Sequence, residues 1–168
     1  LYLDMVVPLF VCLIYMRLDL RHTLLSSITS LLIVTFAIGD VASAIWMSQG
    51  ILMGLICGYF IRKKETIFDD LFYSAILGTF IMVLIDIYFS KLTGYSFMKE
   101  FDSYRDLFPL GSEYMAMAFN IFVAMMPMST ILIVYVGALL IGKKLMILNE
   151  NCTEKYMIIK NFKRYGSY

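Results

Sequence analysis

The stretch that decides the fold is residues 41–64, VASAIWMSQGILMGLICGYFIRKK. It carries no charge before Arg62, and a helix needs roughly 20 apolar residues to cross a bilayer core about 30 Å thick. The basic run Arg62-Lys63-Lys64 then ends the apolar stretch. The segment therefore predicts a membrane-spanning helix.

Other stretches on both sides of this segment have the same apolar character. Charged residues interrupt the chain between them, as expected for loops that connect spans. The five predicted spans cover residues 1–16, 23–39, 41–61, 71–90 and 114–142. The sequence thus predicts an all-α polytopic membrane helical bundle in residues 1–144, followed by a basic amphipathic tail in residues 145–168.

The composition agrees with this class. Hydrophobic residues make up 61% and charged residues 16% of the 168 residues, whereas typical soluble domains contain about 25% charged residues. The mean hydropathy is +0.80. The formal net charge is only +1, so the basic surface of a nucleic-acid-binding protein is not expected.

Basic residues divide unequally between the two sides of the predicted bundle. If the spans alternate in direction, the loops at 17–22 and 62–70 and the C-terminal segment from Lys143 onward share one side, with two, three and six Lys or Arg. The other side has three. The positive-inside rule then places the tail in the cytoplasm and Leu1 outside. One further helix before Leu1 would give six spans with both ends in the cytoplasm.

Polar side chains gather in the outer halves of the predicted spans. A charged residue at the bilayer centre costs roughly 2.5–3.5 kcal/mol on insertion scales, so these positions require an explanation. One interpretation is a polar pocket that opens outward under the loop at 91–113, and another is that the side chains reach the lipid headgroups. The candidate solute-binding residues are Trp46, Gln49, Asp86, Tyr88, Tyr95 and Asn120.

Glycines recur at every fourth position in the third predicted span, as Gly50, Gly54 and Gly58. Such spacing makes a groove on one helix face that lets another backbone approach closely. The pattern favours ordinary packing inside the monomer, and a homodimer face or a contact that re-docks during transport is the alternative.

Catalytic patterns are not found. His22 has no cysteine or serine partner at a suggestive spacing, and the chain has no glycine-rich phosphate loop. Asp69 and Asp70 follow the basic cluster at 62–64 and indicate a charge-balanced turn and not a metal site. We therefore expect no enzymatic activity, no cofactor and no metal.

The tail mixes Lys155, Lys160, Lys163 and Arg164 with apolar residues. A segment of this composition lies on an anionic inner leaflet or against a protein partner. The sequence favours the membrane surface.

The order of these features resembles the YybS-like family of uncharacterised bacterial membrane proteins. That family looks distantly related in fold to the S components of energy-coupling factor (ECF) vitamin transporters and to the rod-shape protein MreD. The residues that carry the resemblance are Pro8-Leu9-Phe10, the Gly50-x-x-x-Gly54-x-x-x-Gly58-Tyr59 stretch ending in Arg62-Lys63-Lys64, Leu92-Thr93-Gly94-Tyr95 and Lys143-Lys144.

The resemblance implies a six-helix domain in a bacterial cytoplasmic membrane that binds a micronutrient from outside. It also implies a transmembrane scaffold and two ATPase subunits as partners. The alternative is a scaffold or assembly protein similar to MreD, which would hold envelope or cytoplasmic partners instead of a small-molecule solute.

Overall fold

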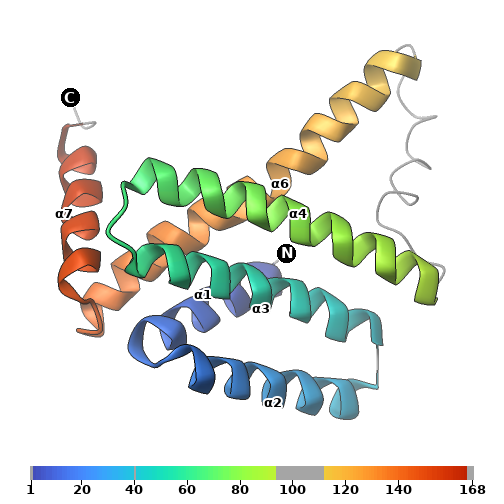
Figure 1. Ribbon diagram of the computed structural model, residues 1–168, viewed down its shortest axis with the longest axis horizontal. Coiled ribbons are helices and arrows are strands. Elements are labelled where there is room, and N and C mark those ends of the chain that lie inside the picture. The colour runs from blue at the N-terminus through green and yellow to red at the C-terminus, as the bar shows by residue number, and fades with distance from the viewer. Residues whose placement is uncertain (1, 40, 94–111, 166–168) are drawn as a thin grey trace.

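The computed structural model describes residues 2–39, 41–93 and 112–165, and every regular element in them is a helix. Figure 1 shows these helices side by side, with the last one crossing the end of the others. Their bounds are α1 Tyr2–Arg17, α2 Leu20–Ile38, α3 Val41–Arg62, α4 Ile67–Thr93, α6 Ser112–Lys144 and α7 Glu150–Tyr165. The predicted all-α membrane helical bundle is confirmed.

Within the described residues, four helices contain an apolar segment long enough to cross a membrane. The segments are Leu20–Ala37, Ser43–Arg62, Ile67–Ile85 and Pro127–Lys144. The apolar part of α1, Met5–Arg17, is shorter. Because α6 has 33 residues, it is about 50 Å long at 1.5 Å per residue, and only its second half is needed to span.

The closest helix pair is α1 against α3, and the glycines of α3 form the contact. A Cβ atom at Gly54 would lie 2.4 Å from the Pro8 carbonyl oxygen, and one at Gly58 would lie 2.8 Å from the Tyr15 ring. At Gly50 the nearest atom, Pro8 Cδ, would be 3.3 Å away. The glycine face therefore lies inside the monomer, against α1, where the missing side chains allow the backbones to meet.

The core lies where α1, α3 and α6 meet. It contains the thiols of Cys12 and Cys57, which behave there as small hydrophobic groups. Ile131, Val134 and Leu139 of α6 complete it and are almost completely buried. Since these side chains come from the second half of α6, that half is held by the bundle.

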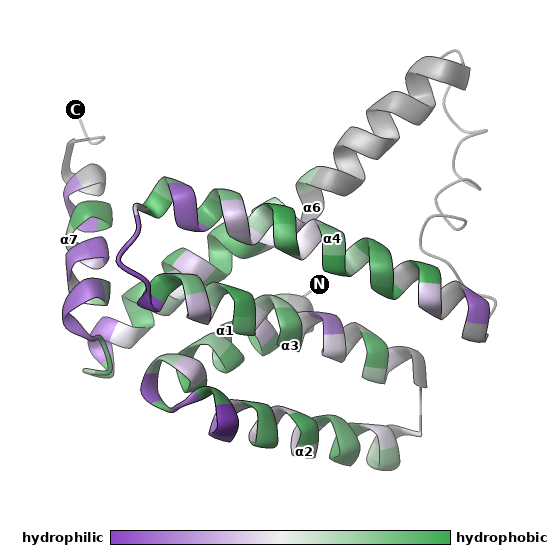
Figure 2. Cartoon of the chain, in the orientation of Figure 1, coloured by the Kyte–Doolittle hydropathy of each residue, from purple (hydrophilic) through white to green (hydrophobic). Residues whose placement is uncertain are grey.

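Helix α2 lies at the edge of the bundle. Only 11% of its spanning segment is buried, and Figure 2 shows that its surface is mostly hydrophobic. Its exposed apolar side chains include Leu25, Ile28, Leu32, Ile33 and Phe36. In a bilayer such a face contacts lipid tails, which are as apolar as the side chains themselves.

Candidate functional site

Five of the six candidate solute-binding residues lie on three helices that contact one another. Gln49 is half-buried on α3, and Tyr88 on α4 is 65% exposed. Trp46, Asp86 and Asn120 belong to α3, α4 and α6, but their side chains, and the whole of Tyr95, lie outside the described part of the structure. Contacts join α3 with α4, α4 with α6, and α3 with α6.

Helix direction puts these positions at the end of the bundle far from α7. Gln49 is near the start of α3, Tyr88 near the end of α4, and Asn120 in the first half of α6. Figure 1 shows, however, that the first half of α6 turns away from α4. The backbone thus brings the α3 and α4 candidates to one end and leaves Asn120 on a diverging segment. The outward pocket stays a prediction.

The other end of the bundle contains a buried ion pair that joins α7 to α4. The Lys155 Nζ atom donates a hydrogen bond to Asp70 Oδ2 at 2.5 Å, and the Tyr135 hydroxyl of α6 donates to the same oxygen at 2.6 Å. Asp70 and Tyr135 are 0% exposed and Lys155 is 4% exposed. Ionic side chains are almost never buried this completely without a partner, so this pair defines the position of α7.

The Lys155 ammonium also caps the end of α3. Its Nζ atom lies 3.1 Å, 3.2 Å and 2.8 Å from the carbonyl oxygens of Phe60, Ile61 and Lys63. The last carbonyls of a helix have no partner within it and form its negative pole, which favours a cation. A single side chain therefore ties α7 to the end of α3 and to the first turn of α4.

Local sequence explains why these groups meet. Thr66 precedes α4, its hydroxyl donates to Asp69 Oδ2 at 2.6 Å, and the Asp69 backbone N–H donates back to the Thr66 hydroxyl at 3.3 Å. This reciprocal cap starts α4 and directs Asp70 inward. On α7, the spacing of Cys152, Lys155 and Ile159 puts them on one helix face.

Two polar atoms beside the ion pair have no hydrogen-bond partner among the described residues. They are Asp70 Oδ1 and Ser74 Oγ, one helical turn apart on α4, and both are fully buried. Unpaired buried polar atoms are rare in folded proteins and cost about 1–3 kcal/mol each. They mark the neighbourhood of Asp70 as a polar region inside an otherwise apolar helix.

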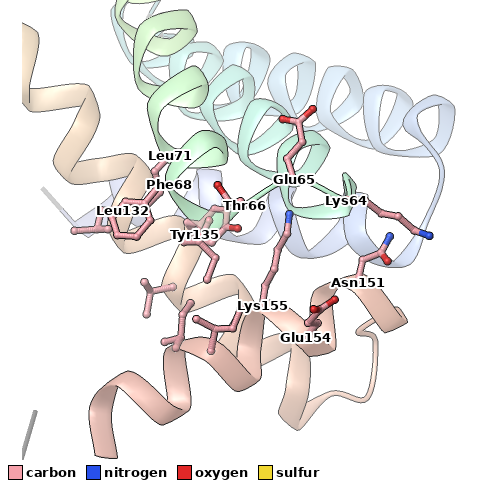
Figure 3. A pocket seen from close by; sticks show the side chains of 14 residues that line it. Lys64, Glu65, Thr66, Phe68, Leu71, Leu132, Tyr135, Asn151, Glu154 and Lys155 are labelled. Carbon is pink, nitrogen blue, oxygen red and sulfur yellow. The ribbon is translucent and has the colours of Figure 1, made fainter. Parts of the chain in front are cut away.

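A cleft of about 930 Å³ opens beside the ion pair, between α4, α6 and α7 (Figure 3). Lys155 and Tyr135 form part of its wall. Seven of the 14 lining residues are apolar, and two of these, Phe68 and Ile158, are exposed at its opening. The apolar set is Ile67, Phe68, Leu71, Leu132, Val136, Ile158 and Ile159, and the polar set is Lys64, Glu65, Thr66, Asn151 and Glu154.

Sequence reasoning missed this site. The charges around Asp70 indicate a charge-balanced turn, yet Asp70 is fully buried, because α4 begins at Ile67 and its first turn packs under α7. The sequence favours the membrane surface for the tail, which stays a prediction, and the structure adds that α7 packs against α6 and α3 of the same chain. A usable signal existed in the spacing of Cys152, Lys155 and Ile159, which places one lysine in the middle of an otherwise apolar stripe.

The described residues contain no group of three His, Cys, Asp or Glu side chains that could hold a metal ion. The charges of the buried pair are matched by each other, by a tyrosine hydroxyl and by backbone carbonyls. The arrangement can hold a helix and border a ligand cleft.

An all-α bundle whose helices can cross a bilayer and which buries an ion pair at one end defines a polytopic integral membrane protein. Residues 1–106 match the family described as "Predicted membrane protein (DUF2232)". Because the match covers more than half of the 168 residues, the chain belongs to that family. No curated protein and no solved structure matches the chain.

The docking of α7 can be tested at Cys152, which is 1% exposed and lies 3.6 Å from the Ile61 carbonyl oxygen. Burial raises the pKa of the Cys152 thiol, so little reactive thiolate forms at neutral pH. Lys155→Gln is expected to release α7 and speed maleimide labelling of Cys152 by about tenfold or more. Labelling is measured by mass spectrometry at neutral pH, with Cys152→Ser as the blank. An unchanged rate in Lys155→Gln would show that Lys155 does not hold the helix.

Proposed function

We propose that this chain is a membrane subunit that binds and helps to transport a small water-soluble solute, as the S components of ECF transporters do, and that it has no enzymatic activity. The observation that carries the proposal is the placement of Gln49, Asp86 and Tyr88 at one end of two helices in contact. Ionisable residues within membrane helices are rare and most often mark solute or ion pathways.

The proposed location is a bacterial cytoplasmic membrane, with α7 in the cytoplasm. Basic residues support this orientation because they gather at the α7 end of the bundle. Arg62 ends α3 and Lys143 and Lys144 end α6, whereas Lys91 is the basic residue in the last turn of α4 at the opposite end. The positive-inside rule assigns the more basic end to the cytoplasm.

Single cysteines at positions 49, 86 and 120 test the outward pocket. An impermeant thiol reagent added to intact cells is expected to label at least two of them, and an excess of the correct solute should slow the labelling. The native thiols give little background, since Cys12, Cys57 and Cys152 are buried. The matched control is Phe68→Cys, which is 84% exposed at the α7 end and should be labelled only after permeabilisation. If none of the three positions reacts from outside, no outward pocket exists.

A second candidate function is a scaffold or assembly protein similar to MreD. The observation that favours it is α2, whose apolar face is almost entirely uncovered within the chain and could hold another membrane protein. Purification in mild detergent separates the two proposals. Co-elution with a transmembrane scaffold and ATPase subunits, or a retained solute in native mass spectrometry, supports transport. Envelope or cytoplasmic partners without a solute support the scaffold.

A further inference from the structure

The cleft beside Lys155 lies at the level where a bilayer changes from acyl chains to headgroups. Its wall includes Ile67, Phe68 and Leu71, the first residues of the α4 spanning segment, and Leu132 and Val136 from the spanning segment of α6. Its other side is α7, which follows the end of that span. The cleft therefore runs from the start of the α4 spanning segment, where the headgroups begin, along the middle of the α6 spanning segment.

The interior of the cleft is suited to an apolar chain. Phe68 is 84% exposed and Ile158 is 52% exposed, and both line the opening. An acyl chain lying in the cleft would cover both side chains. The volume of about 930 Å³ is at the upper end of the range for sites that bind small molecules.

The mouth of the cleft keeps one free charge of each sign. Lys155 is paired with Asp70, and Glu65 lies 3.4 Å from the Lys63 ammonium. Neither Lys64 nor Glu154, both exposed, is in an ion pair among the described residues. Figure 3 shows the Lys64 side chain reaching over α7 toward Asn151, with Glu154 beside it on the same helix.

We propose that this cleft binds a zwitterionic aminophospholipid of the phosphatidylethanolamine class. One acyl chain lies along the apolar wall. The phosphate contacts the Lys64 ammonium and the Asn151 amide, and the headgroup ammonium contacts the Glu154 carboxylate. Charge complementarity selects this occupant, because a purely anionic headgroup would leave Glu154 opposed by like charge, and like charges in contact are disfavoured.

The test uses the full chain purified in detergent, stripped of lipid, and titrated with phosphatidylethanolamine or phosphatidylglycerol of identical acyl chains. Binding is followed by native mass spectrometry. The wild-type chain is expected to bind phosphatidylethanolamine about tenfold more tightly than phosphatidylglycerol, a difference typical of one good charged contact. Equal affinity for the two lipids would overturn the headgroup assignment.

Two variants locate the site. Val136→Trp fills the cleft from α6 and Ile158→Trp fills its mouth from α7, where Ile158 is half-exposed and a larger side chain is tolerated. Each is expected to weaken phosphatidylethanolamine binding by about tenfold or more. Met157→Trp is the matched control, since Met157 is 49% exposed on α7 and does not line the cleft. If the control and Ile158→Trp weaken binding equally, the lipid binds elsewhere.

Removing the two charges tests the headgroup contacts separately from the acyl-chain contacts. Lys64→Gln with Glu154→Gln is expected to abolish the preference for phosphatidylethanolamine while some binding of both lipids persists. Lys160→Gln, an exposed lysine on α7 that does not line the cleft, should leave the preference intact. A preference that survives the double variant would contradict the proposed contacts. Because all three positions are exposed, folding is preserved in either outcome.

Discussion

Lys155→Met is expected to lower the free energy of unfolding by about 3–5 kcal/mol, the cost of breaking a buried ion pair from one side. The substitution keeps an unbranched side chain of similar length but removes the charge. It leaves Asp70, which is 0% exposed, as an uncompensated carboxylate, and it deprives three carbonyl oxygens at the end of α3 of their donor. The measurement is equilibrium unfolding in mixed detergent micelles.

Two further variants make this expectation specific. Lys160→Met removes a charge from the exposed side of the same helix and should change stability by no more than about 0.5 kcal/mol. Asp70→Asn combined with Lys155→Met removes both charges and should recover most of the loss, because a neutral Asn still accepts the Tyr135 hydrogen bond. Equal losses in Lys155→Met and Lys160→Met, or strictly additive losses in the double variant, would show that the pair does not hold α7.

The helices could be predicted because their signals are local. Uncharged runs of spanning length, such as residues 41–61, identify a membrane helix without knowledge of its neighbours. The glycines at 50, 54 and 58 likewise indicate a close helix contact from spacing alone. The spacing does not identify the helix that the glycines contact. That helix is α1, through Pro8 and Tyr15.

The spacing on α7 indicates a buried lysine, but its partner Asp70 could not be predicted, because the signal that joins the two charges is not local. Asp70 and Lys155 are 85 positions apart, and each stands in a segment where a charge is ordinary. Asp70 follows Asp69 at the start of a helix, where acidic residues are common, and Lys155 is one of several lysines in the tail. Only the way in which α4, α6 and α7 pack brings the two charges and Tyr135 together.

The candidate solute-binding residues at the outer end stay a prediction. The cost of a polar group in a span singles out Gln49, Asp86 and Asn120, and this argument places a residue on a helix without saying what it faces. The structure adds the contact between α3 and α4. It also shows the first half of α6 diverging from α4 (Figure 1). The prediction is therefore reduced to a solute site formed by α3 and α4, without Asn120 of α6.

Gly54→Ala is expected to destabilise the chain by about 1–3 kcal/mol, the usual cost of overpacking, while Gly50→Ala should cost less than about 1 kcal/mol. The two substitutions add the same methyl group to the same helix face. At Gly54 the new Cβ would lie 2.4 Å from the Pro8 carbonyl oxygen and 2.9 Å from Pro8 Cα, and these backbone atoms cannot move unless α1 separates from α3. At Gly50 it would lie 3.3 Å from Pro8 Cδ, where a small shift relieves the contact.

Equilibrium unfolding of the two variants, together with cross-linking in membranes, separates monomer packing from a homodimer face. If the glycines pack against α1, Gly54→Ala lowers stability at every protein concentration and leaves the oligomeric state unchanged. If they join two copies of the chain, both substitutions reduce cross-linking and the loss of stability depends on concentration. Only the α1 contact predicts a larger loss of stability for Gly54→Ala than for Gly50→Ala. Pro8 already occupies the space next to Gly54, so a second copy of the chain cannot contact Gly54 there.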